Sequence, residues 1–287
     1  MSSDYILTLS CPDRPGIVAA VSGLLAERGC NIVESQQYGD PITGRFFMRV
    51  QFTVPGPEPG AVADGLRTAL AALVPEFALD WRLYDASVPT RVLILVSKAG
   101  HCLNDLLYRR RSGQLSTIDI VAVASNHPDL RPLTQSYGID YHHLPIGPGG
   151  KAAQEAEILA LVEHYRVDLV VLARYMQVLS DEMCGKLPGR IINIHHSFLP
   201  SFKGARPYHQ AHARGVKLIG ATAHYVTPEL DEGPIIEQEV ARVDHTHSPA
   251  DLMAVGRDME CLALARAVRW HSEHRILLNG DKTVVFR

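Results

Sequence analysis

The sequence predicts an α/β protein of two domains, a small antiparallel sheet followed by a larger, doubly wound and mostly parallel sheet. Three observations predict this fold class. The chain has 287 residues, which is long for one compact domain and sufficient for two. Residues 1–84 carry strand and helix patterns in the order βαββαβ, whereas apolar runs alternate with helical segments from residue 90 onward. We therefore expect domains at 1–84 and 90–287, joined by a linker at 85–89.

The first domain is predicted from periodicity and from turn residues. Residues 5–10 alternate like a strand, and Pro15 and Gly16 then form a turn into a helix with apolar residues at helical spacing. In chain order, the predicted elements are strand 5–10, helix 17–28, strands 31–38 and 45–54, helix 61–73 and strand 77–84. This order is typical of an antiparallel sheet with two helices on one face, as in ferredoxin-like folds.

The second domain is predicted from continuous apolar runs. Residues 91–97 read Arg-Val-Leu-Ile-Leu-Val-Ser, which is typical of a parallel strand covered on both faces. Further strands are predicted at 118–125, 139–144 and 168–172, with helices at 103–111, 129–137 and 152–165 between them. Strands at 218–226 and 235–240 are expected to extend the sheet in antiparallel fashion. A helix at 249–271 and a hairpin around Asn279 and Gly280 follow.

Composition excludes several classes of function. The net charge of −3 and the pI near 6.5 argue against a nucleic-acid binder, which would carry a basic surplus. Five scattered cysteines indicate reduced, mostly buried thiols. The polar N-terminus lacks a signal-peptide pattern, and no apolar run approaches the roughly 18 residues of a membrane span. We therefore expect a cytoplasmic protein without nucleic-acid or membrane partners.

One apolar run carries two polar residues that suit catalysis. Residues 191–200 read Ile-Ile-Asn-Ile-His-His-Ser-Phe-Leu-Pro, so Asn193 and His195 leave the same face if the run is extended. The exit loop of such a strand is where open α/β sheets bind ligands. Asp231 follows 36 positions after His195, in a second loop before a Gly-Pro pair. Amide, imidazole and carboxylate can together polarise a carbonyl, transfer a proton and orient the imidazole.

The residues of this run also have plainer interpretations. A single histidine beside a strand is more often structural than catalytic, and His-His-Ser can also form a capped turn. A metal site is not expected, because the sequence has neither His-Glu-x-x-His nor Cys-x-x-Cys and offers one obvious carboxylate. His196 would lie on the opposite face if the strand continued, so we interpret it as structural.

The motifs together resemble a known family. The folate-dependent formyltransferase-fold enzymes are similar in Asn193-Ile194-His195, in Ser197, Leu199, Pro200 and Gly204, and in Leu230-Asp231-x-Gly233-Pro234. The longer string from His195 to Ala211 narrows the resemblance to formyltetrahydrofolate deformylases, and this resemblance extends over essentially the full chain. It implies hydrolysis of 10-formyltetrahydrofolate to tetrahydrofolate and formate, a reaction of one-carbon and purine metabolism.

The resemblance also implies roles for residues. Asn193 would donate to the oxyanion, His195 would transfer a proton, and Asp231 would accept a proton from water or hold the imidazole; either His195 or Asp231 could be the general base. A further segment matches the family's folate pocket, with Met176, Gln177 and Val178 as binding residues, although these could also be a core strand-to-helix turn. No metal and no cofactor are expected, since folate is the substrate.

The N-terminus resembles ACT domains, small modules that pair with one another and often bind amino acids. The resemblance lies in the run Leu-Ser-Cys-Pro-Asp-Arg-Pro-Gly-Ile-Val at 9–18. It implies a candidate site for an amino-acid effector at Asp13, Arg14, Pro15, Gly16 and Ile17, and a homo-oligomer. The plainer alternative is that Pro15 and Gly16 only make the turn into the helix.

Two other functions remain as alternatives: a transferase that passes formyl to an amine, and a non-catalytic ACT-type sensor. The complete Asn-His-Asp set argues against the sensor. Related transferases hold a phosphorylated amine with a glycine-rich loop, whereas this chain has the bulkier segment 98–105 at that place. We expect His101 and Asn104 to fill the acceptor cavity and leave room for water.

Overall fold

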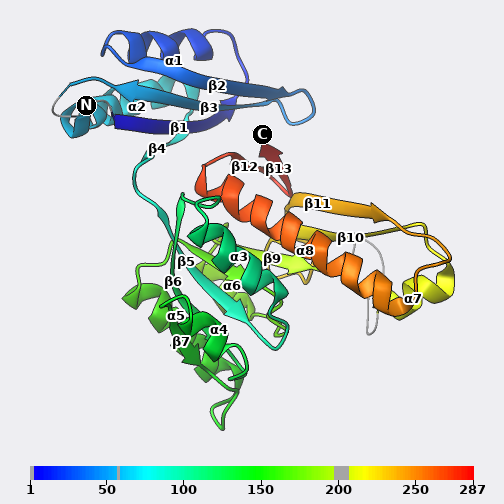
Figure 1. The fold of residues 1–287 in the computed structure, drawn as a ribbon. Coiled ribbons are helices and arrows are strands. Elements are labelled where there is room, and N and C mark those ends of the chain that lie inside the picture. Colours follow the sequence, from blue (N-terminus) through cyan, green and yellow to red (C-terminus); the bar gives the residue numbers. More distant parts are fainter. Residues whose placement is uncertain (1–2, 57–58, 197–206) are drawn as a thin grey trace. The chain divides into compact units, whose positions relative to one another are not determined.

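The computed structural model describes residues 3–56, 59–196 and 207–287, and the chain divides into two compact units (Figure 1). The first unit consists of Met1–Val88 with Glu273–Asn279 and Thr283–Arg287, and the second consists of Pro89–Ser272 with Gly280–Lys282. The change from one unit to the next therefore falls inside the segment predicted as a linker. The predicted second domain differs from this division at its C-terminal tail, most of which belongs to the first unit.

The first unit is built around a four-stranded antiparallel sheet. Its neighbours are ordered β2-β3-β1-β4, and the two helices α1 and α2 contact each other and cover one face of the sheet. The elements are β1 (Ser3–Pro12), α1 (Ile17–Ala26), β2 (Asn31–Asp40), β3 (Arg45–Val54), α2 (Pro59–Phe77) and β4 (Asp80–Asp85). The predicted order βαββαβ is confirmed.

The core of this unit lies between the helices and alternate residues of the strands. Leu7, Leu9 and Cys11 of β1 pack with Leu66 and Phe77 of α2, and all five are buried. Helix α2 ends later than the predicted residue 73, because Phe77 still contributes to this core. The last strand accordingly starts at Asp80 instead of residue 77.

The tail covers the other face of the same sheet. Arg49 of β3 is only 1% exposed; its Nη1 donates to Glu34 at 2.6 Å and its Nη2 donates to the carbonyl of Glu273 at 3.1 Å. Asn279 donates to the carboxylate of Asp40 at 2.7 Å. The tail forms the two-stranded hairpin β12 (Ile276–Asn279) and β13 (Lys282–Val285). These buried polar contacts explain why the tail joins the first unit.

The second unit contains a seven-stranded sheet with the order β11-β10-β9-β8-β5-β6-β7. Strands β5 to β9 pair in parallel, and β10 and β11 extend the sheet in antiparallel fashion, as predicted. The strands are β5 (Thr90–Val96), β6 (Ile118–Ser125), β7 (Asp140–His143), β8 (Leu169–Leu172), β9 (Ile191–His195), β10 (Leu218–Tyr225) and β11 (Ile235–Arg242).

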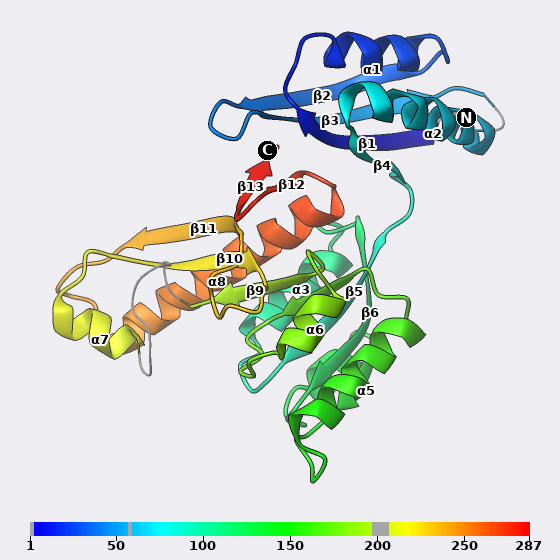
Figure 2. The same cartoon turned by 180° about the vertical axis from the view of Figure 1, so that it is seen from behind.

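Helices cover both faces of this sheet. Figure 1 shows α3 and α8 in front of it, and Figure 2, seen from behind, shows α5 and α6. The helices are α3 (His101–Arg111), α4 (Arg131–Gln135), α5 (Gly150–His164), α6 (Asp181–Lys186), α7 (Pro207–Arg214) and α8 (Pro249–Ser272). Helix α4 is shorter than the predicted 129–137, and α6 and α7 were not predicted, since each is too short for a clear periodicity.

The topology places a crevice beside β5. The chain leaves β5 toward β6 and β7 and then returns to β8 on the other side of β5, so the strand order switches between these two strands. Ligands of open α/β sheets bind at the carboxyl ends of strands at such a point. Ser97, directly after β5, accepts a hydrogen bond from the backbone N–H of Met176 at 3.0 Å. The exits of β5 and β8 are thus tied together.

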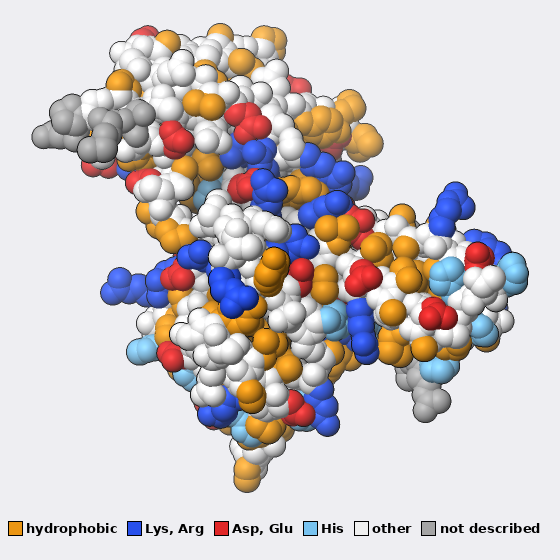
Figure 3. Space-filling view, in the orientation of Figure 1, with side chains coloured by type: hydrophobic (Ala, Val, Ile, Leu, Met, Phe, Trp, Pro, Cys, Tyr) orange, Lys and Arg blue, Asp and Glu red, His pale blue; other side chains and the backbone are white. Residues whose placement is uncertain are grey.

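No helix in the described part of the chain is long and apolar enough to cross a membrane. On the face drawn in Figure 3, hydrophobic side chains are interspersed with charged and polar ones. This mixture agrees with the 46% apolar and 21% charged composition of the chain.

Candidate active site

A cavity of about 220 Å³ lies at the carboxyl ends of β8 and β9. Its walls come from the exits of these strands and from the loop that joins β10 to β11. The predicted catalytic and folate-binding residues all line it: Asn193, His195, Asp231, Met176, Gln177 and Val178. The structure therefore brings together residues from three separate segments of the chain. The motif residues Ser197, Leu199, Pro200 and Gly204 lie outside the described residues.

Strand β9 delivers the amide and the imidazole to this cavity. Asn193 and His195 share one face of the strand, while Ile192 and Ile194 are buried on the other, as the alternation predicts. The Nδ1 atom of His195 lies 3.3 Å from Oδ2 of Asp231. The other ring nitrogen, Nε2, is buried and has no hydrogen-bond partner among the described residues. One nitrogen of the imidazole is thus held by the carboxylate, and the second is available to a bound molecule.

The loop between β10 and β11 holds Asp231 in place. Its φ of 59° is in the left-handed region, which aspartate and asparagine tolerate better than most residues. A side chain at Gly233 would collide with the carbonyl of Tyr225, because a Cβ there would lie 1.8 Å from that oxygen. The hydrogen bond from His195, against the opposing effect of burial, lowers the pKa of Asp231. The carboxylate is therefore ionised at neutral pH.

His224 of β10 fixes the orientation of the Asn193 amide. It pairs with Asn193 across the strands, and its Nδ1 lies 2.9 Å from the carbonyl oxygen of Tyr225, to which a ring N–H must donate. Burial lowers the pKa of His224, so the ring is neutral and its Nε2 is an acceptor. The Nδ2 atom of Asn193 lies 3.2 Å from that Nε2 and donates to it. The amide N–H₂ is thereby oriented, with its second hydrogen available.

His196 does not occupy the opposite face of the strand. Strand β9 ends at His195, and the two rings stack with centroids 4.8 Å apart. Both histidines line the same cavity. Burial, with a contribution from the positive charge of Arg174, lowers the pKa of His196 to about 4. His196 is therefore a neutral ring at physiological pH.

The folate-pocket segment follows β8 and presents apolar side chains at the cavity. Met176 is 61% exposed and Val178 is 56% exposed, although both side chains are hydrophobic. Exposed apolar side chains beside a cavity can cover a flat ring system. The alternative of a buried core turn does not fit these two side chains.

The candidate effector residues lie together in the first unit. Asp13, Arg14, Pro15, Gly16 and Ile17 line one open hollow of about 810 Å³ with part of α1 and Phe46. Gly16 caps α1 with a φ of 99°, a conformation that favours glycine. The guanidinium of Arg14 donates to the carbonyl of Glu76 at 2.8 Å, so Arg14 braces this turn.

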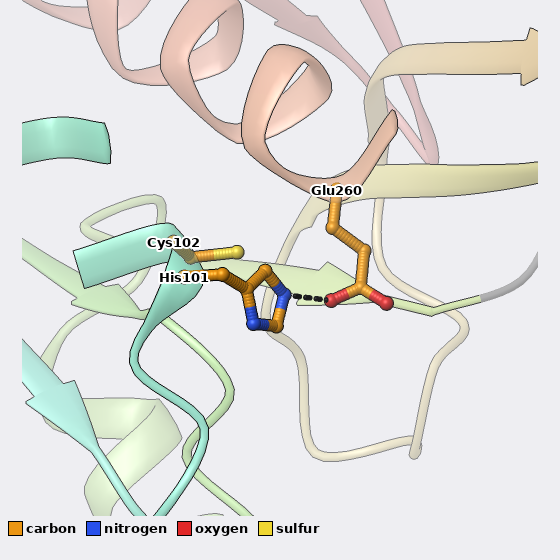
Figure 4. Close-up of side chains that lie close together, drawn as sticks. All are labelled: His101, Cys102 and Glu260. Carbon is orange, nitrogen blue, oxygen red and sulfur yellow. Dashed lines mark hydrogen bonds and ion pairs between the residues drawn. The ribbon is translucent and has the colours of Figure 1, made fainter. Parts of the chain in front are cut away.

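A second polar cluster joins α3 to α8. Figure 4 shows His101 and Cys102 on α3 beside Glu260 on α8, and potential ligand atoms of the three side chains lie within 4.8 Å of one another. His101 Nε2 donates to Glu260 at 2.7 Å. The guanidinium of Arg174 lies 3.5 Å from the same carboxylate and opposes a cation there. The five cysteines are free thiols, of which Cys11, Cys102 and Cys184 are buried.

The prediction that His101 and Asn104 fill the acceptor side of the catalytic cavity is wrong. His101 and Asn104 line a separate hollow of about 440 Å³ between α3 and α8, and neither lines the cavity of His195. His101 turns toward Glu260 because that buried carboxylate needs a hydrogen-bond donor.

Three residues of the site were not predicted: His224, Arg174 and Glu260. His224 could have been found from strand pairing, since it lies opposite Asn193 in the register of β9 with β10. A charged residue inside an apolar face is the signal for Glu260, which α8 buries among alanines and leucines. Arg174 has no pattern signal, because its position depends on the backbone conformation after β8.

Comparison with known proteins identifies both units. A formyl transferase family model matches residues 90–268, and an ACT domain model matches residues 5–60. The formyltetrahydrofolate deformylase of Corynebacterium sp. (strain P-1) is 55% identical over 99% of this chain and 98% of its own. The deformylase of Bacillus subtilis (strain 168) is 48% identical over 98% of this chain and 93% of its own.

A solved structure agrees with the sequence matches. The crystal structure of the formyltetrahydrofolate deformylase from Burkholderia mallei superposes with a TM-score of 0.94 at 52% identity. It covers 99% of this chain, and this chain covers all of it. The chain accordingly belongs to the formyltetrahydrofolate deformylases, enzymes that hydrolyse 10-formyltetrahydrofolate.

Proposed function

We propose that Asn193, His195 and Asp231 carry out the hydrolysis of 10-formyltetrahydrofolate to tetrahydrofolate and formate. The observation that carries this assignment is the geometry of His195. Its Nδ1 lies 3.3 Å from the Asp231 carboxylate, while its Nε2 is buried beside the cavity without a partner among the described residues. An imidazole held in this way has one defined tautomer and one free nitrogen for proton transfer.

In the first step, water attacks the formyl carbon. Nε2 of His195 takes a proton from the water as the water oxygen bonds to that carbon. The ionised Asp231 accepts the Nδ1–H and stabilises the imidazolium that forms. Asn193, oriented by His224, donates its second amide hydrogen to the developing oxyanion. This assigns His195 as the general base and Asp231 as the group that orients it.

In the second step, the imidazolium returns the proton to the leaving nitrogen. The carbon–nitrogen bond then breaks and releases tetrahydrofolate and formic acid, which loses its remaining acidic proton to become formate. Each proton and electron pair is accounted for by water, substrate and His195. The proposed reaction needs no metal and no cofactor.

The proposed role of Met176, Gln177 and Val178 is to hold the pterin. The cavity of about 220 Å³ is smaller than the 300–1,000 Å³ typical of sites for whole drug-sized ligands. One end of the folate would therefore enter it, and the remainder would extend over the exposed side chains of Met176 and Val178.

The first unit is proposed to bind an amino-acid effector and to form a homo-oligomer. In the hollow beside α1, the carboxylate of Asp13 could accept from an effector ammonium, and the backbone N–H groups at the N-terminus of α1 could donate to the effector carboxylate. Edge strand β2 exposes Ile32, Val33 and Tyr38, and an apolar edge is a surface for pairing with a second copy.

A cytoplasmic location is proposed on the basis of the reduced cysteines.

A product assay tests the proposed reaction. Purified full-length protein is incubated with 10-formyltetrahydrofolate, with and without an amine such as glycinamide ribonucleotide, and formate and formylated amine are both measured. Formate should be released at the same rate in both mixtures. Stoichiometric transfer of formyl to the amine would contradict hydrolysis. Such a transfer would still require the cavity and its three catalytic residues.

A further inference from the structure

Arg174 adopts a backbone conformation that an arginine seldom takes. It lies two residues after β8, with a φ of 65° in the left-handed region. Glycine would adopt this conformation without strain, whereas a residue with a Cβ adopts it at a cost. Strained residues of this kind concentrate at functional sites, where the side chain serves a purpose.

On one side, Arg174 is anchored by Glu260. This glutamate is 1% exposed and accepts hydrogen bonds from His101 at 2.7 Å and from the hydroxyl of Tyr208 at 3.1 Å. The Nε of Arg174 lies 3.5 Å from Oε2 of Glu260. Burial opposes ionisation of Glu260, but the hydrogen bond from His101 and the charge of Arg174 outweigh it and lower the pKa. A buried anion therefore holds the guanidinium in place.

On the other side, Arg174 lines the cavity that contains His195. The distance of 3.5 Å between Nε of Arg174 and Oε2 of Glu260 is too long for a good hydrogen bond. Nε has no hydrogen-bond partner among the residues that the structure describes. Within the described ranges, Nε2 of His195 in the same cavity is also a buried side-chain atom without a hydrogen-bond partner. Glu260 thus balances the charge of Arg174 without using all of its donors.

Hydrolysis creates a ligand that matches this arrangement. The formyl group of the substrate is neutral, whereas the released formate is a carboxylate, because the water oxygen has joined the carbon and the bond to nitrogen has broken. Negative charge therefore appears on the one-carbon fragment during the reaction. A guanidinium binds a carboxylate with two parallel N–H donors, better than a lysine ammonium does.

We propose that Arg174, positioned by Glu260, forms a subsite that binds the formate carboxylate next to His195. This inference rests on the proposed hydrolysis, since a formyl transfer to an amine produces no carboxylate in the cavity. It also assigns Glu260 and His101 as positioning residues, which act on the reaction only through Arg174.

Product inhibition by formate tests the subsite. Hydrolysis by the full-length protein is measured while sodium formate is added, with sodium chloride as the control for ionic strength. Arg174→Gly removes the guanidinium and suits the left-handed backbone, but it leaves the buried carboxylate of Glu260 without its cation. The melting temperature of this variant should therefore fall, and inhibition is measured at a temperature at which circular dichroism shows that it is folded. Its inhibition constant for formate should rise about tenfold or more. Arg174→Lys keeps the positive charge but loses the two parallel N–H donors, so it should raise the inhibition constant for formate by a smaller factor.

Arg166→Gly is the matched control. Arg166 also has a positive φ, of 48°, but it is exposed in the turn between α5 and β8 and does not line the cavity. Its replacement makes the same chemical change at the same kind of backbone position. Turnover and inhibition by formate should both stay at the wild-type values.

The proposal is overturned if formate inhibits Arg174→Gly and Arg174→Lys as strongly as the wild type. It is also overturned if formate does not inhibit the wild type at all, or if Arg166→Gly weakens inhibition equally. These outcomes differ from failure of the proposed catalytic residues. Full activity of an Asp231→Asn variant would remove the catalytic assignment and leave the measured response of Arg174 to formate unchanged.

Discussion

The Nδ1 atom of His195 lies 3.3 Å from Oδ2 of Asp231, although His195 ends strand β9 and Asp231 lies in the loop between β10 and β11. The loop that carries Asp231 is shaped by a left-handed residue and by a glycine that no other residue can replace. A backbone constraint of this kind sets which nitrogen of the imidazole faces the cavity. Loop geometry and proton transfer are therefore linked at this site.

Asp231→Asn should reduce turnover by about 100-fold or more while the protein stays folded. Asparagine keeps the size of the side chain and tolerates the φ of 59° at this position, but it cannot carry the charge that stabilises an imidazolium. The rate of formate release on folded, soluble protein is the measurement. Glu232→Gln, at the exposed neighbouring position, is the control and should retain activity. A variant Asp231→Asn within a few-fold of wild type would disprove the role.

Asn193→Ala should lower kcat on the order of 10²–10³-fold with a smaller change in KM. The amide is proposed to donate to an oxyanion that exists only after attack, so its loss affects the transition state more than substrate binding. Steady-state kinetics at several folate concentrations separate the two parameters. A change confined to KM would show that Asn193 binds substrate and takes no part in stabilising the oxyanion.

Stability should fall between pH 6.5 and about pH 4, in part because of His271. Its Nδ1 lies 2.8 Å from the Tyr225 hydroxyl oxygen, with which it shares a hydrogen bond, and burial, aided by Arg190, lowers the pKa of His271 to about 4. The unfolded ring binds a proton near pH 6.5 and the folded ring only near pH 4. The unfolded state therefore binds more protons within this window, and acidification favours unfolding by about 1.4 kcal/mol for each pH unit per histidine.

Urea unfolding at pH 7 and at pH 5 measures this effect. The loss of unfolding free energy between the two values should be smaller for His271→Gln, which cannot take up a proton. His196, with its pKa also near 4, contributes in the same direction and should remain in the variant. An equal loss in wild type and His271→Gln would exclude His271 as a source of the acid sensitivity.

Val33→Glu should reduce the size of the assembly. Val33 lies on edge strand β2 and is 58% exposed, so a charge there should prevent pairing of this edge with a second copy. Light scattering gives the mass. Val240→Glu, on the edge strand β11 of the larger sheet, makes the same change in the second unit. Dissociation by Val240→Glu alone would locate the interface on that sheet instead.

Local patterns predicted the elements whose side chains repeat regularly. The apolar run at 91–97 and the alternation around Asn193 and His195 led to β5 and to the catalytic face of β9, because burial repeats with the period of the strand. Contacts between residues that lie far apart in the sequence leave no such repeating pattern. Glu260 meets Arg174 only after α8 packs on the sheet, and Arg49 meets the carbonyl of Glu273 across 224 positions of the sequence.

The membership of Glu273–Asn279 and Thr283–Arg287 in the first unit has a consequence for synthesis of the chain. A ribosome makes the strands of the first sheet early and makes the tail only after the whole second unit. Until then the nascent chain lacks the carbonyl of Glu273, and the buried guanidinium of Arg49 lacks one of its acceptors. The face of the first sheet that the tail covers can therefore be completed only after the whole second unit has been synthesised.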